Sequence, residues 1–224
     1  MISIYIKTND TLYIKDPEKS DLGRKIVESS IELIHNIGFE KFTFKKLADD
    51  INSTEASVYR YFKNKHQLLV YLSSWYWAWI DFQIKYKTTN IPDPYLKLKI
   101  IIKVISESSL ADPNIIHVDE SLLHKIIISE SSKAYLTKNV DRENKEGYFK
   151  TYKSLCNSIS RVFLEINPDY AYPTTLASNL IETAHEQIFF AEHIPSLTDL
   201  RVSDNDYRDV CSFLENMFLK ILSK

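Results

Sequence analysis

The 224-residue sequence contains only three glycines and two cysteines. Phosphate-binding loops depend on closely spaced glycines, so a nucleotide cradle of that kind is not expected. The two cysteines, Cys156 and Cys211, lie far apart and lack the spacing of a metal site or a redox motif. We therefore expect two small, mostly apolar side chains in a reducing compartment rather than a disulfide bond.

Long apolar runs and a secretory leader are missing as well. Every apolar run is broken well short of the roughly 18 residues that a membrane-spanning helix needs, and no basic segment followed by an apolar run opens the chain. We expect a cytoplasmic protein with no membrane partner. The formal net charge of −2 also excludes a chain that coats nucleic acid along its whole surface.

The residues that are present favour a compact helical protein. Hydrophobic residues make up 44% of the chain, and apolar positions recur at helical spacing over most of its length. At this length the chain can bury roughly 70 to 75% of the surface of its unfolded form, as one domain or two small ones. The sequence therefore predicts an all-α fold.

The most informative stretch runs from residue 39 to residue 69. Thr43 is placed as an N-cap, because its hydroxyl can accept a hydrogen bond from a backbone N–H at a helix start. One face of a short helix then follows at spacings of three and four residues. Its apolar members are Phe44, Leu47, Ala48 and Ile51.

A second short helix is predicted immediately after three polar residues, Asn52 to Thr54. Side chains of this kind favour caps and turns, so the first helix should end there. Glu55 suits the positive end of a new helix, and Val58, Tyr61 and Phe62 give that helix an inward edge. A helix, a tight polar turn and a second short helix are typical of a helix-turn-helix.

This stretch resembles the N-terminal signature of the tetracycline-repressor (TetR) family of transcriptional regulators. The resemblance covers roughly residues 20 to 70 and depends on many positions in the same order and spacing. They are Gly38-Phe39, Thr43-Phe44, Leu47-Ala48, Val58-Tyr59-Arg60-Tyr61-Phe62-Lys63-Asn64-Lys65 and Leu68-Leu69. The turn departs from the usual Gly-Val-Ser, but Asn52 tolerates the left-handed backbone nearly as well as glycine does.

The resemblance implies a DNA-binding head and assigns candidate contacts to it. Residues of the second helix would read bases in a major groove, and flanking hydroxyls and lysines would contact phosphates. From Lys19 to His66 there are nine Lys and Arg against seven Asp and Glu, a balance of only +2, so affinity must depend on where these charges lie. The candidate DNA-binding residues are Thr43, Lys46, Thr54, Glu55, Ala56, Ser57, Tyr59, Arg60, Tyr61 and Lys65.

The resemblance does not include the first residues of the chain. Residues 2 to 15 alternate apolar and polar side chains around Asn9-Asp10, which predicts a short β-hairpin. We accordingly divide the chain into an N-terminal extension (1–16), a helix-turn-helix domain (17–66) and a helical ligand-binding and dimerisation domain (67–224). The first helix should follow the caps Asp16 and Ser20 and end at Gly38.

The second half is predicted to contain helices and an apolar cavity. A long apolar stripe runs from Leu68 through Phe82 to Tyr86 and stops at Pro92. Further helices are expected at 95–110, 119–129, 142–166, with Gly147 as a weak point, 174–193, and 203–222, with Ser203 as its cap. Aromatic side chains near a few polar ones could bind a small apolar ligand. The candidates are Trp75, Tyr76, Trp79, Tyr148, Tyr152, His185 and Phe189.

The last two helices are the expected dimer interface. Ala177, Ala184 and Ala191 give one helix a face of small residues, which allows a close approach. The last helix offers an apolar stripe that includes Leu214 and Phe218. In the family these helices pair with their copies across a two-fold axis, although the same stripes could also be buried within one subunit.

Together with these patterns, the resemblance implies a ligand-responsive, sequence-specific regulator of transcription. We expect a homodimeric repressor that leaves its operator when a small apolar ligand binds. Two alternatives stay open. One is a helical-bundle metalloenzyme. Its only support is the spacing of Glu182 and His185, which is that of a Glu-x-x-His metal motif. A di-iron site needs a second such pair, and the sequence has none. The other is a protein-binding adaptor that kept the head. We expect no cofactor, no catalytic residue and no metal.

Overall fold

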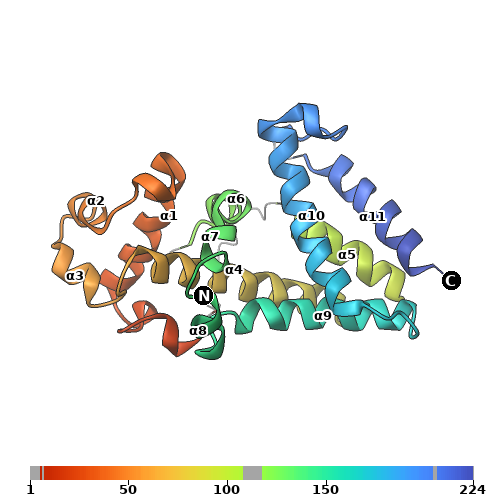
Figure 1. Cartoon of the computed structure of the whole chain (residues 1–224), viewed down its shortest axis with the longest axis horizontal. Coiled ribbons are helices and arrows are strands. Elements are labelled where there is room, and N and C mark those ends of the chain that lie inside the picture. Colours follow the sequence, from red (N-terminus) through yellow and green to blue (C-terminus); the bar gives the residue numbers. More distant parts are fainter. Residues whose placement is uncertain (1–5, 7, 108–117, 204–205, 224) are drawn as a thin grey trace. The chain divides into compact units, whose positions relative to one another are not determined.

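The computed structural model describes residues 6, 8–107, 118–203 and 206–223, and these residues are helical or lie in turns and connecting segments (Figure 1). The described ranges contain no β-strand, and their only bridge of the β type is the isolated pair Ser203 and Asp206. The predicted all-α class is confirmed. In the same ranges, no helix is both long enough and apolar enough to cross a membrane.

The chain forms two compact units, which are described separately below. The first consists of Met1–Ala78 and Ser109–Thr151, and the second of Trp79–Ser108 and Tyr152–Lys224. The chain therefore passes between the units inside two helices, α4 and α9, and again between residues 108 and 109. The helices are α1 (Asp21–Lys41), α2 (Phe44–Asp50), α3 (Glu55–Tyr59), α4 (Lys65–Thr88), α5 (Pro94–Ser106), α6 (Glu120–Glu130), α7 (Ser132–Tyr135), α8 (Val140–Lys145), α9 (Lys150–Ile166), α10 (Pro173–His193) and α11 (Arg208–Leu222).

Helix α1 begins where its sequence predicts, and its regular geometry is interrupted at the predicted Gly38, before its last residue, Lys41. The Ser20 hydroxyl accepts a hydrogen bond from the Gly23 amide at 3.2 Å, and Asp16 caps the short 3₁₀ turn η2 (Pro17–Lys19) just before it. Regular helical geometry stops at Gly38, which has φ +76° and ψ 153°. Only glycine adopts this conformation readily, so the chain changes direction here at little cost.

The predicted N-terminal hairpin is wrong for the residues that the structure describes. Asp10–Leu12 form a 3₁₀ turn, η1, in which the Asn9 side chain accepts from the Thr11 amide at 3.4 Å. The Tyr13 hydroxyl also donates to Asp10 at 2.7 Å. Asn and Asp side chains make such local bonds readily, and these bonds replace a strand ladder. Ile2 and Ile4, the rest of the predicted first strand, lie outside the described residues.

The long apolar stripe of α4 is buried only over its first four turns. Leu68, Leu72 and Trp75 are at most 2% exposed. Farther along, Phe82 is 40% and Tyr86 74% exposed, so the prediction of one continuous buried stripe is wrong at this end. The two rings stack on each other with their centroids 6.2 Å apart. Helix α4 ends at Thr88, four residues before Pro92.

Three predicted helices have different boundaries. The helix expected at 95–110 is α5, which ends at Ser106 with Glu107 already extended. Gly147, with φ +85°, separates α8 from α9, where the sequence favoured one helix with a weak point. Helix α11 begins at Arg208, so Ser203 is not its cap. The short helix α7 was not predicted. By contrast, α6 begins within one residue of its predicted start, and Asp119 caps it by accepting from the Leu122 amide at 2.9 Å.

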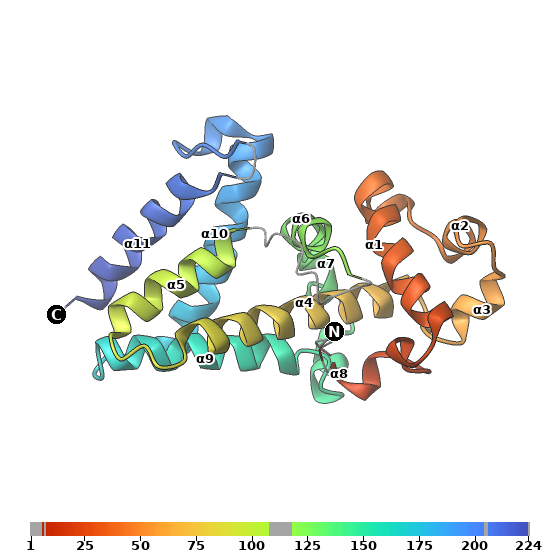
Figure 2. The same ribbon diagram turned by 180° about the vertical axis from the view of Figure 1, so that it is seen from behind.

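The core of the second unit is built by α5, α10 and α11, with α9 packed beside them (Figure 2). Phe163 of α9 stacks on Phe218 of α11, with ring centroids 6.1 Å apart and neither ring exposed. The small faces of α10 at Ala177 and Ala184 are also fully buried within this one chain. Of the two possibilities left open by the sequence, a dimer interface or burial within one subunit, these two alanines follow the second.

Candidate nucleic-acid interface

Helix α2 is the first of two short helices that position the exposed face of the head. The Thr43 hydroxyl accepts from the Lys46 amide at 3.2 Å, as the N-cap prediction requires. Phe44, Leu47 and Ala48 are at most 4% exposed and fix the inward side of the helix. Thr43 and Lys46 stay on the exposed side, although the Lys46 ammonium donates to the Lys41 carbonyl at 2.9 Å.

The turn between α2 and α3 depends on one asparagine. Asn52 has φ +54°, the left-handed conformation expected of it. The Ser53 amide then donates to the Ala48 carbonyl at 2.8 Å, which reverses the chain at the end of α2. A helix-turn-helix usually has glycine in this turn, and Asn52 provides the same backbone geometry at a small cost.

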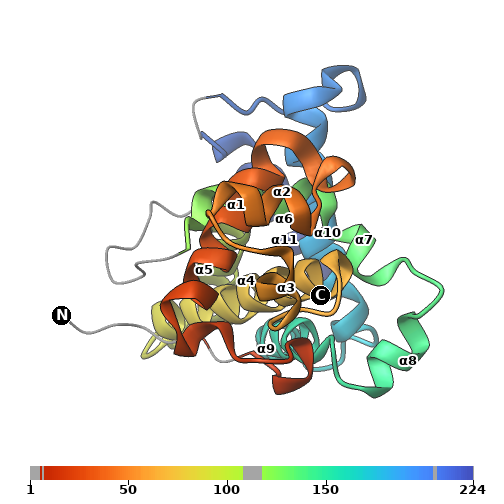
Figure 3. The same cartoon turned by 90° about the vertical axis from the view of Figure 1, so that its left-hand side faces the viewer.

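Helix α3 presents a short polar face. Its N-cap Thr54 accepts from the Ser57 amide at 3.2 Å and also bonds the Ser57 hydroxyl at 2.9 Å. Arg60 donates to the same Ser57 hydroxyl at 3.1 Å. Val58 is the only fully buried residue of the helix, and Tyr59 is 47% exposed with its ring 5.1 Å from that of Phe44. The exposed residues of this face are Thr54, Glu55, Ala56, Tyr59 and Arg60. Helix α3 itself is labelled in Figure 3.

Tyr61 does not lie on that exposed face. It is 2% exposed, and its hydroxyl pairs with the Ser20 hydroxyl at the start of α1 at 2.7 Å. Burial acts to raise the pKa of Tyr61, but hydrogen bonds with Ser20 and Lys15 and the nearby positive charges leave that pKa below its ordinary value. The structure gives Tyr61 a packing role, and its contact with a phosphate stays a prediction.

Lys65 joins the start of α4 to the end of α1. Its ammonium group donates to the carbonyls of Phe39 and Glu40 at 3.0 Å each and to that of Phe42 at 3.3 Å. It also lies 4.8 Å from the centroid of the Phe39 ring. A cation at the C-terminal end of a helix is favourable, because the unpaired carbonyls there carry partial negative charge.

Sequence reasoning missed two residues that organise the head. Gln67 accepts from the Lys63 amide at 2.8 Å through Oε1 and donates to the Thr11 carbonyl at 3.3 Å through Nε2. Lys15, from the segment for which we predicted a hairpin, lies with its Nζ 5.1 Å from the centroid of the Tyr61 ring. The one sequence signal near these residues was Asn64, which precedes α4. Its side chain accepts from the Gln67 amide at 2.8 Å, as a residue at a helix start does.

The candidate ligand-binding residues divide between the two units. In the first unit, Trp75, Tyr76 and Tyr148 are buried, and the Tyr76 hydroxyl pairs with Nδ1 of His124 at 2.5 Å. In the second unit, Trp79 and His185 are buried and Phe189 packs its ring against His193, with centroids 4.7 Å apart. The role of each in binding a ligand stays a prediction.

Glu182, the carboxylate considered for a metal site, accepts a hydrogen bond from the Tyr152 hydroxyl at 2.8 Å. Among the described residues, no group of three or more His, Cys, Asp or Glu side chains is arranged to bind a metal ion.

One family model matches the chain. Residues 26–72 match the model described as bacterial regulatory proteins, tetR family. The matched segment begins inside α1, includes α2, the turn and α3, and ends in the third turn of α4. No curated protein sequence matches the chain.

Solved structures with the same fold cover most of the chain at low identity. A bacterial regulatory protein in the tetR family from Rhodococcus RHA1 has a TM-score of 0.64 at 13% identity, covering 91% of this chain and 98% of its own. AibR in complex with isovaleryl coenzyme A and operator DNA has a TM-score of 0.59 at 18% identity, covering 87% and 97%. The fatty acid degradation regulator FadR from Bacillus halodurans has a TM-score of 0.55 at 14% identity, covering 89% and 93%.

The two kinds of similarity agree on the head and on the architecture. The family match places the helix-turn-helix where the capped, polar-faced α3 lies. The structural neighbours share the all-α fold over nearly their full length. Residues 26–72 match the model of the tetR family of bacterial regulatory proteins, and the chain as a whole has the all-α fold of these solved structures.

Proposed function

We propose that the protein is a sequence-specific, ligand-responsive regulator of transcription that acts as a homodimeric repressor. The observation that carries the proposal is the exposed polar face of α3, from Thr54 to Arg60, on a helix that its buried Val58 and the aromatic core hold firmly. A helix of this kind, presented by a helix-turn-helix, enters the major groove of DNA. Among the neighbours, AibR was solved with operator DNA.

In this proposal Tyr59 and Arg60 are the principal DNA contacts. Arg60 can bond a base edge or a phosphate once it leaves Ser57, which it contacts at 3.1 Å. Tyr59 keeps its ring on Phe44, so its hydroxyl is positioned without loss of side-chain freedom on binding. Thr43 and Lys46 at the start of α2 would contact the adjacent phosphates.

Two copies would bind a near-palindromic operator, with half-sites about one helical turn apart. The exposed apolar residues near the end of the chain support a homodimer through the α10–α11 region: Ile194 is 41%, Leu197 58% and Phe213 38% exposed. A small apolar ligand that prefers the dimer with its heads too far apart would release the DNA, with a coupling of about 1 to 3 kcal/mol. AibR, which was solved with isovaleryl coenzyme A as well as operator DNA, supports a ligand of partly apolar character.

The test begins with selection of binding sites from random duplex DNA by the purified full-length protein. We expect a palindrome, and an affinity for it that falls steeply with salt as counterions are released. Enrichment of no sequence by a folded protein would contradict the proposal and favour the adaptor, an outcome that the low local charge of +2 would then explain.

A matched pair of variants tests the assigned face. Tyr59→Phe removes one hydroxyl from α3, and Tyr95→Phe removes one from an equally exposed tyrosine of the second unit, 46% against 47% exposed. We expect Tyr59→Phe to weaken operator binding about fivefold, the loss of roughly one hydrogen bond, and Tyr95→Phe to change nothing. Equal affinities for the two variants would remove Tyr59 from the interface.

A further inference from the structure

The segment from Asn9 to Asp16, outside the family match, is bonded to the head at its C-terminal end. The Ile14 amide donates to the Tyr61 carbonyl at 2.8 Å. Tyr61 follows α3, the proposed recognition helix, by two residues, so this bond fixes the chain just beyond the end of that helix. Lys15 then lies over the Tyr61 ring with its Nζ 5.1 Å from the centroid, and its side chain is exposed.

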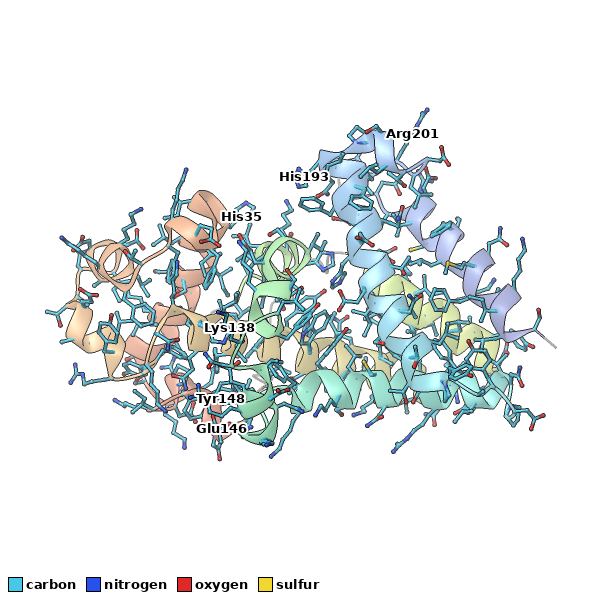
Figure 4. The ribbon with its side chains drawn as sticks, viewed as in Figure 1. His35, Lys138, Glu146, Tyr148, His193 and Arg201 are labelled. Atoms are coloured by element: carbon cyan, nitrogen blue, oxygen red, sulfur yellow. The ribbon has the colours of Figure 1, made fainter. Side chains whose placement is uncertain are left out.

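The other end of the segment is bonded to the corner between α8 and α9. The Asn9 amide group donates to the Gly147 carbonyl at 2.8 Å, and the Thr11 hydroxyl donates to the Glu146 carbonyl at 3.3 Å. Glu146 and Tyr148, which flank Gly147, are labelled at this corner in Figure 4. The corner is itself fixed to the start of α4, because His66 contacts the buried carboxylate of Glu143 at 3.1 Å.

Between its two ends the segment is packed rather than loose. Leu12 is fully buried, and the Thr11 carbonyl accepts from Gln67 of α4 at 3.3 Å. Tyr13 packs edge-on against Tyr71, with ring centroids 6.2 Å apart. All of the segment's contacts with the head and the corner lie inside the first unit and join residues more than 40 positions apart in the sequence.

We propose that residues Asn9–Asp16 form a strap that fixes the end of the recognition helix to the α8–α9 corner and places Lys15 beside it as a further DNA phosphate contact. The proposal rests on the proposed DNA-binding function. Lys15 is an exposed cation over the ring of Tyr61, two residues beyond the end of α3. The strap limits its position, so little freedom is lost when it binds a phosphate.

The experiment uses the full-length protein and three variants. Lys15→Met removes the proposed contact while keeping an unbranched side chain. Asn9→Ala combined with Thr11→Val removes the two side-chain bonds at the corner, more than 40 residues before α3 in the sequence. Lys145→Met is the matched control, because it removes one charge from an exposed lysine of α8. Circular dichroism and thermal melting check that each variant is folded.

The contact and the strap give different signatures. For Lys15→Met we expect affinity for selected and random DNA to fall equally, about three- to tenfold, with the slope of log K against log salt smaller by about 0.9. For the Asn9 and Thr11 variant we expect amide hydrogen exchange at Ile14 to quicken at least tenfold and DNA affinity to fall with an unchanged salt slope. Lys145→Met should resemble the wild type in all three measurements.

Each part has its own contrary result. If the wild type binds DNA and Lys15→Met binds it with the same affinity and slope, Lys15 is not a contact. If Ile14 exchange is unchanged in the double variant, the corner does not hold the strap. A wild type that binds no DNA would contradict the proposed function instead, and the exchange measurement would still decide on the strap.

Discussion

At the scale of single residues, His124 shows how burial sets a charge. It is 2% exposed on α6, and desolvation, with a smaller effect of Lys125, lowers its pKa from 6.5 to about 4. Its Nδ1 pairs with the Tyr76 hydroxyl at 2.5 Å. The imidazole is therefore neutral at physiological pH, and protonating it inside the fold is unfavourable.

This burial predicts a loss of stability in mild acid. The unfolded chain binds a proton at His124 below pH 6.5, whereas the folded chain does so only near pH 4, so the stabilisation present above pH 6.5 is lost as the pH falls between these values. From pH 7.5 to pH 5 we expect the free energy of unfolding to fall by about 2 kcal/mol through this residue. Urea unfolding at the two pH values measures it.

The comparison that isolates His124 is His124→Gln, which should lack this part of the pH dependence, with His35→Gln as the control. His35 is exposed on α1 and is labelled in Figure 4. A His124→Gln variant with the full wild-type pH dependence would mean that other groups cause it.

Residue roles were predictable where they depend on near neighbours. The caps at Thr43 and Ser20 and the left-handed Asn52 follow from local chemistry, and the structure has all three. The positions of Tyr61 and Lys65 depend on partners 41 and 23 to 26 residues away. A sequence pattern carries no signal for such partners. Both residues were therefore predicted to contact DNA, although Tyr61 had also been placed on the inward edge of its helix.

At the scale of elements, the turn η2 and helix α1 meet at a glycine. A β-carbon on Gly23 would lie 2.3 Å from the Pro17 carbonyl oxygen and 2.6 Å from its Cα, both backbone atoms. Gly23→Ala should therefore destabilise the protein by about 1 to 3 kcal/mol. In an ordinary helix the same change would stabilise the protein by up to about 1 kcal/mol. The sign of the change in unfolding free energy therefore shows whether η2 packs closely on Gly23.

Chemical denaturation of Gly23→Ala measures this effect, with Glu28→Ala on the exposed side of the same helix as its control. We expect Glu28→Ala to stay within about 0.5 kcal/mol of the wild type. A Gly23→Ala protein at least as stable as the wild type would show that η2 does not pack closely on α1.

Elements were predictable to the extent that their ends carry caps or glycines. Helices α1 and α2 begin at predicted caps, α3 begins after the predicted polar turn, and Gly38 marks the break in α1. Helix α6 begins one residue after its predicted start. The N-terminal segment failed because a few alternating residues cannot distinguish a strand from a segment packed between helices. The start of α11 failed because several polar residues precede it and each could serve as a cap.

At the scale of the whole molecule, the proposed dimer predicts that exposed apolar residues on α11 are buried between subunits and that those on α4 are not. Phe213 on α11 is 38% and Phe82 on α4 40% exposed, both in the second unit. If α11 lies in the interface, Phe213→Glu places a charge there and should weaken self-association at least tenfold, because a buried unpaired charge is costly. Phe82→Glu should leave it unchanged.

Sedimentation across a range of protein concentrations measures both variants against the wild type. A wild type that stays monomeric at all concentrations would contradict the dimer itself. Dissociation by Phe82→Glu and not by Phe213→Glu would move the interface to the end of α4. Operator affinity, measured in parallel, should fall with dimer content, since each half-site needs one head.

The ammonium group of Lys65 has three N–H bonds, and three backbone carbonyls at the end of α1 already accept from it. A phosphate bound at Lys65 would have to take a donor from one of them. The backbone carbonyls at the end of α1 would thus compete with a DNA phosphate for the ammonium group of Lys65. Any DNA affinity that Lys65 contributes is the difference in free energy between its bonds to a phosphate and its bonds to these carbonyls. A variant with a less ordered end of α1 would lose less on that exchange, so its Lys65 would bind a phosphate more tightly.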